Sequence, residues 1–275
     1  MRVYRVWSVP WMIVAVVLIL SFATNVVASD KPGWAQNLDL KTELIRWSVT
    51  GLMAGATAFV YRQDVWVDAP LIGGSVDKAY RRRELVSGAW LGAGLATGIA
   101  AVSLVPTSDG WITEGNYRHG LGLVQAVVAT GFVSTVLKQA IGRKRPDYDA
   151  RAAQGRDLAY GRRSFPSMHA SLSWTTSSYL VLNIWNRWLP KSRDATDTAL
   201  AISGSALVSA AAAYVSWSRL HDNRHHLSDV VSGAAIGTIS GGLFYYWSEA
   251  LFLSDNTDRV AAAFSPGKAV LTLRF

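Results

Sequence analysis

The residues best suited to chemistry in this 275-residue chain fall into three short blocks. The first block has Lys138 and, after six further residues, Arg145-Pro146. Seven positions are about two helical turns, so both cations share one face for as long as a helix continues. The proline then favours the end of that helix. Such a pair either binds an anion or simply caps a helix end in contact with water.

The second block, Ser164-Phe165-Pro166-Ser167-Met168-His169, opens the next apolar segment. Proline suits the first turn of a helix, and a helix start presents free N–H groups and the positive end of its dipole. Ser167 adds a hydroxyl donor there, and His169 lies where it could give a proton to a leaving group. The alternative is an ordinary capped helix start that happens to contain a histidine.

The third block contains Ser218-Arg219, His225 and Asp229. The spacing of His225 and Asp229 places both on one face of a helix. Asp229 could then accept a hydrogen bond from one imidazole nitrogen and leave the other nitrogen free to attack an electrophile. Arg219 has the planar fork that binds phosphate through two hydrogen bonds. The alternative is a surface pair on a helix.

A zinc site is a further alternative for the third block. His221 and His225 approximate the His-Glu-x-x-His pattern, with Asp222 in the acidic position. Aspartate reaches less far than glutamate, and the neighbouring Arg219 and Arg224 repel a cation. We therefore expect no metal ion at this site.

Helix-length apolar segments link the blocks and predict an all-α bundle of about six helices. The expected helices are residues 42–62, 84–106, 118–141, 167–188, 197–217 and 227–253. They are rich in Gly, Ala and Ser, which permits close helix packing in membranes, although a soluble bundle is the alternative. The tail reads as two short strands about a turn. We thus expect a signal or anchor over 1–28, the bundle over 29–256 and a β-hairpin over 257–275.

The composition restricts the partners. Half of the residues are hydrophobic, 17% are charged and none is cysteine, which excludes a disordered chain, a disulfide scaffold and a Cys-ligated metal site. The net charge of +8 suits nucleic acid, anionic lipid or a phosphate-bearing substrate. The 12 tryptophans suit a membrane interface. Composition therefore favours a membrane and leaves nucleic acid, anionic lipid and a phosphate-bearing substrate open as partners.

The first residues resemble an export signal. Arg2 and Arg5 precede the apolar run 11–28, which ends in the small-residue sequence Val26-Val27-Ala28. An uncleaved anchor helix is the alternative, because the run is long. If the first run is an anchor that starts inside the cell and the segment 42–62 does not cross the membrane, the three blocks lie on the outer side of that membrane. We expect a bacterial inner-membrane protein whose site faces the periplasm, with a soluble periplasmic domain as the alternative.

In their order and spacing, the three blocks resemble the type 2 phosphatidic acid phosphatase superfamily. This family also includes bacterial class A acid phosphatases and vanadium haloperoxidases. Its pattern is Lys-x6-Arg-Pro, then Pro-Ser-Gly-His, then Ser-Arg-x5-His-x3-Asp. The chain matches this pattern between about residues 118 and 240 at every position except Met168, where the family usually has Gly.

The resemblance implies a role for each matching residue. His225 is similar to the nucleophile that becomes a phosphohistidine, Asp229 to the residue that orients it, and His169 to the general acid and later base. The ligands of the phosphate are implied to be Lys138, Arg145, Ser167, the N–H group of Met168, and Arg219. The family uses no metal or cofactor for hydrolysis. The resemblance implies a membrane and a phosphorylated lipid or small phosphate ester as partners, and no nucleic acid.

The function implied is that of a metal-independent phosphatase acting on monoesters or diphosphates. A lipid-borne substrate such as phosphatidic acid, a polyprenyl diphosphate or a lipid A phosphate fits the apolar segments. A soluble acid phosphatase, a lipid phosphotransferase and a non-catalytic protein that binds anionic lipid are the alternatives. Met168 affects the choice of substrate and acceptor more than the phosphate chemistry.

Overall fold

The computed structural model describes residues 40–105, 113–189 and 194–256, and within these ranges it is all-helical. This confirms the predicted fold class. The long helices are α2 (Leu40–Arg62), α3 (Gly88–Leu104), α4 (Glu114–Ile141), α7 (Met168–Asn183), α8 (Ala195–His221) and α9 (Leu227–Asn256). Two short helices were not expected, α5 (Tyr148–Ala153) and α6 (Leu158–Gly161), and the predicted helix 167–188 ends in a π-helical turn, η2 (Ile184–Trp188). The predicted signal or anchor and the predicted C-terminal hairpin lie outside the described residues.

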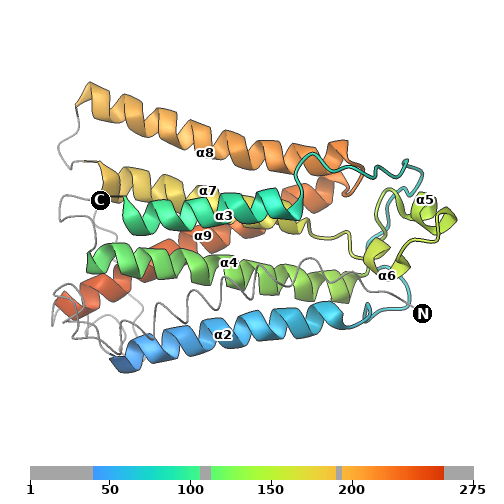
Figure 1. Cartoon of the computed structure of the whole chain (residues 1–275), viewed down its shortest axis with the longest axis horizontal. Coiled ribbons are helices and arrows are strands. Elements are labelled where there is room, and N and C mark those ends of the chain that lie inside the picture. The colour runs from blue at the N-terminus through green and yellow to red at the C-terminus, as the bar shows by residue number, and fades with distance from the viewer. Residues whose placement is uncertain (1–39, 106–112, 190–193, 257–275) are drawn as a thin grey trace.

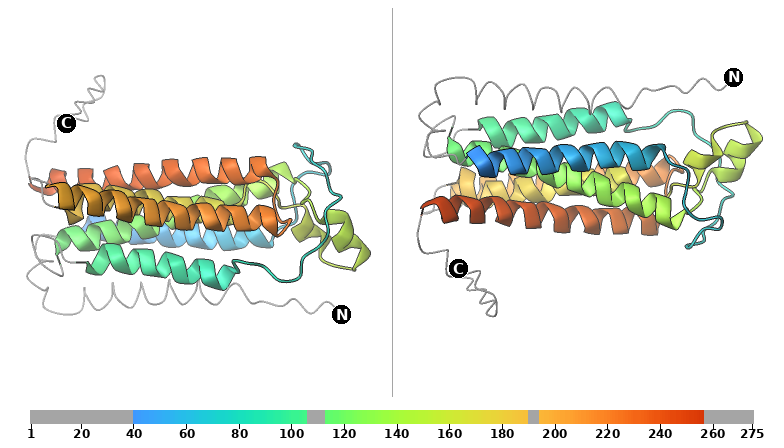
Figure 2. Two further views of the ribbon diagram at one scale, coloured as in Figure 1. Left: turned by 90° about the horizontal axis from the view of Figure 1, so that it is seen from above. Right: turned by 90° about the horizontal axis from the view of Figure 1, so that it is seen from below.

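The long helices lie side by side, and the two short α-helices sit at one end of the bundle (Figures 1 and 2). Helix α7 is central, since it contacts α3, α4, α8 and α9, whereas α2 packs against α4. The apolar core is formed by Val102, Leu123, Ala126, Tyr179 and Tyr245. The helices therefore form a scaffold whose loops meet at the end that carries α5 and α6.

A row of glycines on α9 lets this helix approach α7 unusually closely. A Cβ atom built on Gly233 would lie 2.6 Å from the carbonyl oxygen of Ser167, and one on Gly237 would lie 2.1 Å from that of Ser171. Gly241 faces Thr175 in the same way. The expected close packing through small residues is thus confirmed for this pair, and it places the first residues of α7 against the start of α9.

Large apolar side chains cover the outer faces of the bundle. On α8 and α9 they include Leu200, Leu207, Trp217, Leu243 and Trp247, each at least half exposed. By length and composition, α4, α8 and α9 are each able to cross a membrane, and the apolar helix α3 is shorter. An exposed apolar surface of this extent is typical of a protein surrounded by lipid.

Two local features redirect the chain at the end of the bundle that carries α5 and α6. Helix α4 is capped by Gly142, which has φ of +63° and donates its N–H to the carbonyl oxygen of Lys138 at 3.2 Å. Glycine adopts this left-handed conformation without steric cost, so the chain leaves the helix axis directly after the last turn. Helix α7 begins directly after Ser167, the N-cap residue, whose side chain makes no capping hydrogen bond.

The contact between α7 and α9 generates a prediction with a matched control on the same helix. Gly237→Ala inserts a methyl group against the α7 backbone and should lower the melting temperature in detergent by several degrees. Gly242→Ala meets no atom within 4 Å and should leave the melting temperature unchanged or slightly higher, because alanine favours helix. Equal shifts for the two variants would contradict the proposed close approach.

Candidate active site

The structure brings the predicted residues to one end of the bundle. Lys138 lies in the last turn of α4, Ser167 caps α7, and Met168 and His169 begin that helix. Arg219 lies in the last turn of α8. The others are Arg145 in the loop after α4, His225 in the loop before α9, and Asp229 in the first turn of α9.

The expectation that His225 and Asp229 share a helix face was wrong, and the helix that could have aligned Lys138 with Arg145 ends before Arg145. Helix α4 ends at Ile141, so Arg145 lies beyond it and meets Lys138 through a common neighbour, the carbonyl oxygen of Arg163. Helix α9 begins at Leu227, so the histidine at 225 precedes the helix that carries Asp229. In both cases a loop, not a continuous helix face, aligns the pair.

Asp229 is fully buried and strongly held. Its Oδ1 accepts a hydrogen bond from Arg143 Nη1 at 2.6 Å, and its Oδ2 accepts from Ser164 Oγ at 2.6 Å and from the His226 N–H at 2.8 Å. His225 Nδ1 faces the same Oδ2 at 3.5 Å. The carboxylate is therefore fixed from three sides and directed at the imidazole.

His225 is buried, and its two nitrogens have different neighbours. Nδ1 faces Asp229, whereas Nε2 lies 3.5 Å from Nη1 of Arg145. Burial, and next the positive charge of Arg145, hold the pKa of His225 well below 6.5. The imidazole is therefore neutral near pH 7, with Nε2 available as the nitrogen that does not face a carboxylate.

Lys138 is placed differently from the expected phosphate ligand. Its ammonium group donates to the carbonyl oxygens of Arg163 at 3.0 Å and Ser164 at 3.3 Å, and to that of Pro166. These acceptors equal the number of N–H donors that an ammonium group has. Lys138 thus ties the end of α4 to the loop before α7 and contributes positive charge from behind that loop.

The buried polar atoms without a hydrogen-bond partner among the described residues include three on residues of the second and third blocks. They are Ser167 Oγ, His169 Nε2 and Arg219 Nε. His169 lies within electrostatic range of Arg219, Arg145 and Lys138. Buried polar atoms of this kind are rare unless a ligand satisfies them. The N-terminal N–H groups of α7 at Met168 and His169 also lack intrahelical acceptors, as at every helix start. The arrangement suits a tetrahedral anion.

Several residues of the site were missed from the sequence. Arg143 belongs to none of the sequence motifs, but it is buried and paired with Asp229. Ser164 opens the second block without a role of its own in the sequence, yet it holds the same carboxylate. Arg224 is buried and pairs with Asp147 at 3.2 Å and with Glu84 at 3.2 Å. The many arginines between residues 143 and 163 were the sequence signal that could have indicated further site residues in this loop.

The zinc alternative gains no geometric support. No group of three or more metal-ligating His, Asp or Glu side chains occurs among the described residues. His221 is partly exposed, stacks on Trp217 with ring centroids 5.1 Å apart and contacts Asp222. His225 instead faces Asp229 and Arg145, so the two histidines belong to different environments.

This geometry agrees with a match to known proteins. Residues 119–253 match the family model of the PAP2 superfamily. This segment of the chain, just under half of its length, is similar to the PAP2 superfamily. The matched segment contains all three blocks, and it supplies the four helices α4, α7, α8 and α9 whose ends form the site. The resemblance based on the motifs is therefore confirmed.

Three curated proteins that are similar to this chain have names that refer to phosphatases. The chain is 35% identical over 137 residues to a PA-phosphatase related-family protein of Dictyostelium discoideum, covering 48% of this chain and 49% of the relative. It is 31% identical to lipid phosphate phosphatase 1 of Arabidopsis thaliana, covering 46% and 43%, and 31% identical to lipid A 4'-phosphatase of Bacteroides thetaiotaomicron, covering 41% and 46%. The chain thus spans about half the length of the relatives it matches. No solved structure gives a significant match.

The ion pair between Arg143 and Asp229 generates a stability prediction. Arg143→Met leaves a fully buried carboxylate without its cation and should reduce the free energy of unfolding by about 3–5 kcal/mol. Arg83→Met, at an exposed position in another loop, is the matched control and should have no measurable effect. Thermal unfolding in detergent measures both, and equal melting temperatures would show that the pair contributes nothing.

Proposed function

We propose that the chain is a phosphatase that transfers a phosphoryl group to His225 and then to water. The observation that carries this proposal is the set of unpartnered buried donors, Ser167 Oγ, His169 Nε2 and Arg219 Nε, in a cationic surrounding beside a neutral histidine. A phosphate group would satisfy these donors. Preorganised donors and cations are what phosphoryl transfer requires, because charge spreads over the equatorial oxygens.

The proposed reaction has two steps. In the first, Nε2 of His225 attacks phosphorus, the bond from phosphorus to the leaving oxygen breaks, and His169 gives that oxygen a proton. In the second, water attacks the phosphohistidine while His169 takes a proton from it, and inorganic phosphate leaves. Asp229 stabilises the imidazole through Nδ1.

The cations have different roles in the proposed reaction. Arg219 and the N–H groups at the start of α7 bind the phosphate oxygens directly, and Arg145 lies beside the attacking nitrogen. Lys138 acts by charge and by holding the loop 163–166, because its N–H groups already have carbonyl acceptors. Arg143 and Ser164 act through Asp229 as positioning residues.

A lipid-borne phosphate monoester or diphosphate is the proposed substrate. The relatives are named for lipid phosphates, diacylglycerol pyrophosphate and lipid A. In addition, three apolar helices suggest a membrane protein, and the site lies at one end of these helices. A lipid held in the surrounding bilayer would therefore meet the site with its headgroup.

The orientation in the membrane depends on α2. Gln139 at the end of α4 binds the carbonyl oxygens of Val60 and Gln63, and Trp47 binds Tyr117 at the other end, so α2 and α4 run in parallel along their length. Residue 40 therefore lies at the end remote from the site. Because α2 runs along α4, the condition that 42–62 does not cross the membrane is not met. We propose that the site faces the periplasm across a bacterial inner membrane, which requires residue 40 to lie on the cytoplasmic side. This orientation is incompatible with a signal or anchor over 1–28 that carries residue 40 across the membrane.

Histidine variants test the function. We expect the parent to release phosphate from phosphatidic acid or a polyprenyl diphosphate in excess EDTA, and His225→Ala to reduce kcat at least about a thousandfold, as loss of a nucleophile does. His221→Ala is the control and should keep near-parental activity. Loss of activity with EDTA and in both variants would favour the zinc alternative, and unchanged activity in a folded His225→Ala protein would refute the nucleophile.

The orientation can be tested because the chain has no cysteine. Asp77→Cys introduces one exposed thiol in the loop between α2 and α3, at the site end. In intact cells with a permeable outer membrane, a membrane-impermeant maleimide should label this thiol. Labelling only after lysis would place the site in the cytoplasm and overturn the periplasmic orientation, while the phosphatase proposal would stand.

A further inference from the structure

The loop between α2 and α3, residues 63–87, lies across the site end of the bundle. The Trp66 N–H donates to the carbonyl oxygen of Gln139 at 3.0 Å, and the Lys78 N–H donates to that of Pro146 at 2.9 Å. Near its end, the Leu85 N–H donates to Asp222 Oδ2 at 2.9 Å. The loop is therefore attached to the first and third blocks, although it lies outside the segment that matches the family model.

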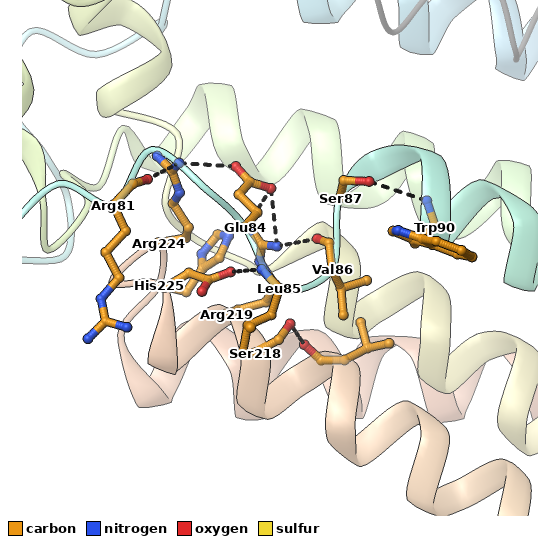
Figure 3. A network of polar contacts seen from close by, with 12 residues as sticks. Arg81, Glu84, Leu85, Val86, Ser87, Trp90, Ser218, Arg219, Arg224 and His225 are labelled. Atoms are coloured by element: carbon orange, nitrogen blue, oxygen red, sulfur yellow. Dashed lines mark hydrogen bonds and ion pairs between the residues drawn. The ribbon is translucent and has the colours of Figure 1, made fainter.

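Glu84 in this loop contacts two buried arginines at once (Figure 3). Its Oε2 accepts from Arg219 Nη2 at 3.2 Å and from Nη1 at 3.4 Å. Its Oε1 lies 3.2 Å from Nη2 of Arg224. The carboxylate thus joins the end of α8 to the residue that precedes His225 in the chain.

The contacts of Arg219 distinguish its three nitrogens. Nη1 donates to the carbonyl oxygen of Val86 at 2.8 Å and also contacts Glu84, and Nη2 contacts Glu84. Nε has no partner, although Arg219 is only 1% exposed. Because the guanidinium group is planar and its five N–H donors are fixed, partners on the terminal nitrogens determine where Nε points.

We propose that Glu84 is a positioning residue for phosphate binding. It holds the terminal nitrogens of Arg219 so that Nε faces the proposed phosphate site, here termed the phosphate cradle, which includes Ser167 Oγ and His169 Nε2. This inference rests on the proposed function. Without Glu84, the guanidinium group would keep the carbonyl oxygen of Val86 but lose the partner common to both terminal nitrogens. A rotation of the fork would then cost phosphate affinity and rate, although no residue that touches phosphate had changed.

The same contact favours positioning over competition with the substrate. Glu84 occupies the terminal nitrogens and leaves Nε unpartnered, so an anion can bind Arg219 without displacing the carboxylate. Its other oxygen is held by Arg224, which is itself paired with Asp147 at 3.2 Å. Glu84 is therefore part of a fixed network of charges and is only about a quarter exposed as a side chain.

The experiment uses the full chain in detergent, with phosphatidic acid as substrate and inorganic orthovanadate as a probe of the phosphate cradle. We expect Glu84→Ala to lower kcat/KM and to weaken orthovanadate binding by about 10- to 100-fold. Glu84→Gln keeps an oxygen acceptor and should lose less, and it carries the test if the alanine variant does not fold. Asp77→Asn removes an exposed carboxylate from the same loop and should match the parent.

A double-mutant cycle separates positioning from a merely structural role. If Glu84 acts through Arg219, Glu84→Ala should cause no further loss of orthovanadate affinity in the Arg219→Ala protein. Full additivity of the two losses, or unchanged or tighter orthovanadate binding in Glu84→Ala, would overturn the positioning role while the phosphatase proposal stands. A parent protein that neither releases phosphate nor binds orthovanadate would overturn the proposed function and this inference with it.

Discussion

The constraint on which this structure depends is the burial of many positive charges at one end of an apolar bundle. Each buried guanidinium or ammonium group needs acceptors, since an unpaired charge away from water is very costly. The buried cations at this end are Lys138, Arg143, Arg145, Arg151, Arg163, Arg219 and Arg224. Few carboxylates face them, so carbonyl oxygens of the loops supply many of the remaining acceptors.

This requirement explains why the loops of the site are ordered. The carbonyl oxygen of Arg163 accepts from both Lys138 and Arg145, and that of Arg224 accepts from Arg145. Each loop therefore adopts a conformation that places its carbonyl groups on a cation from another block. The glycines of α9 complete the arrangement, because they bring α7 close enough for the Ser167 N–H to reach the carbonyl oxygen of Asp229 at 2.9 Å.

Much of this architecture could be predicted from the sequence, for identifiable physical reasons. Hydrophobic segments and glycine spacing are local signals, so the long helices and their close contact were accessible. The three blocks had fixed internal spacing, which located the site. Arg143 and Glu84 were not accessible, because their roles depend on partners 86 and 135 positions away in the chain. In the sequence, Arg143 stands in a basic loop and Glu84 follows three arginines, so both resemble charges exposed to water. Only the fold brings their buried partners next to them.

The distinction between lysine and arginine explains how a crowded cationic site still has room for a ligand. Lys138 is a compact ammonium group, and the carbonyl oxygens of one loop match all of its donors. Arg219 has more donors than its neighbours satisfy, and the rigid plane of the guanidinium group keeps the unsatisfied Nε in a defined direction. An Arg219→Lys substitution would keep the charge but lose both that direction and the contact with Glu84. Charge alone is therefore insufficient at this position, and the shape of the fork is what would link the loop 63–87 to the proposed phosphate site.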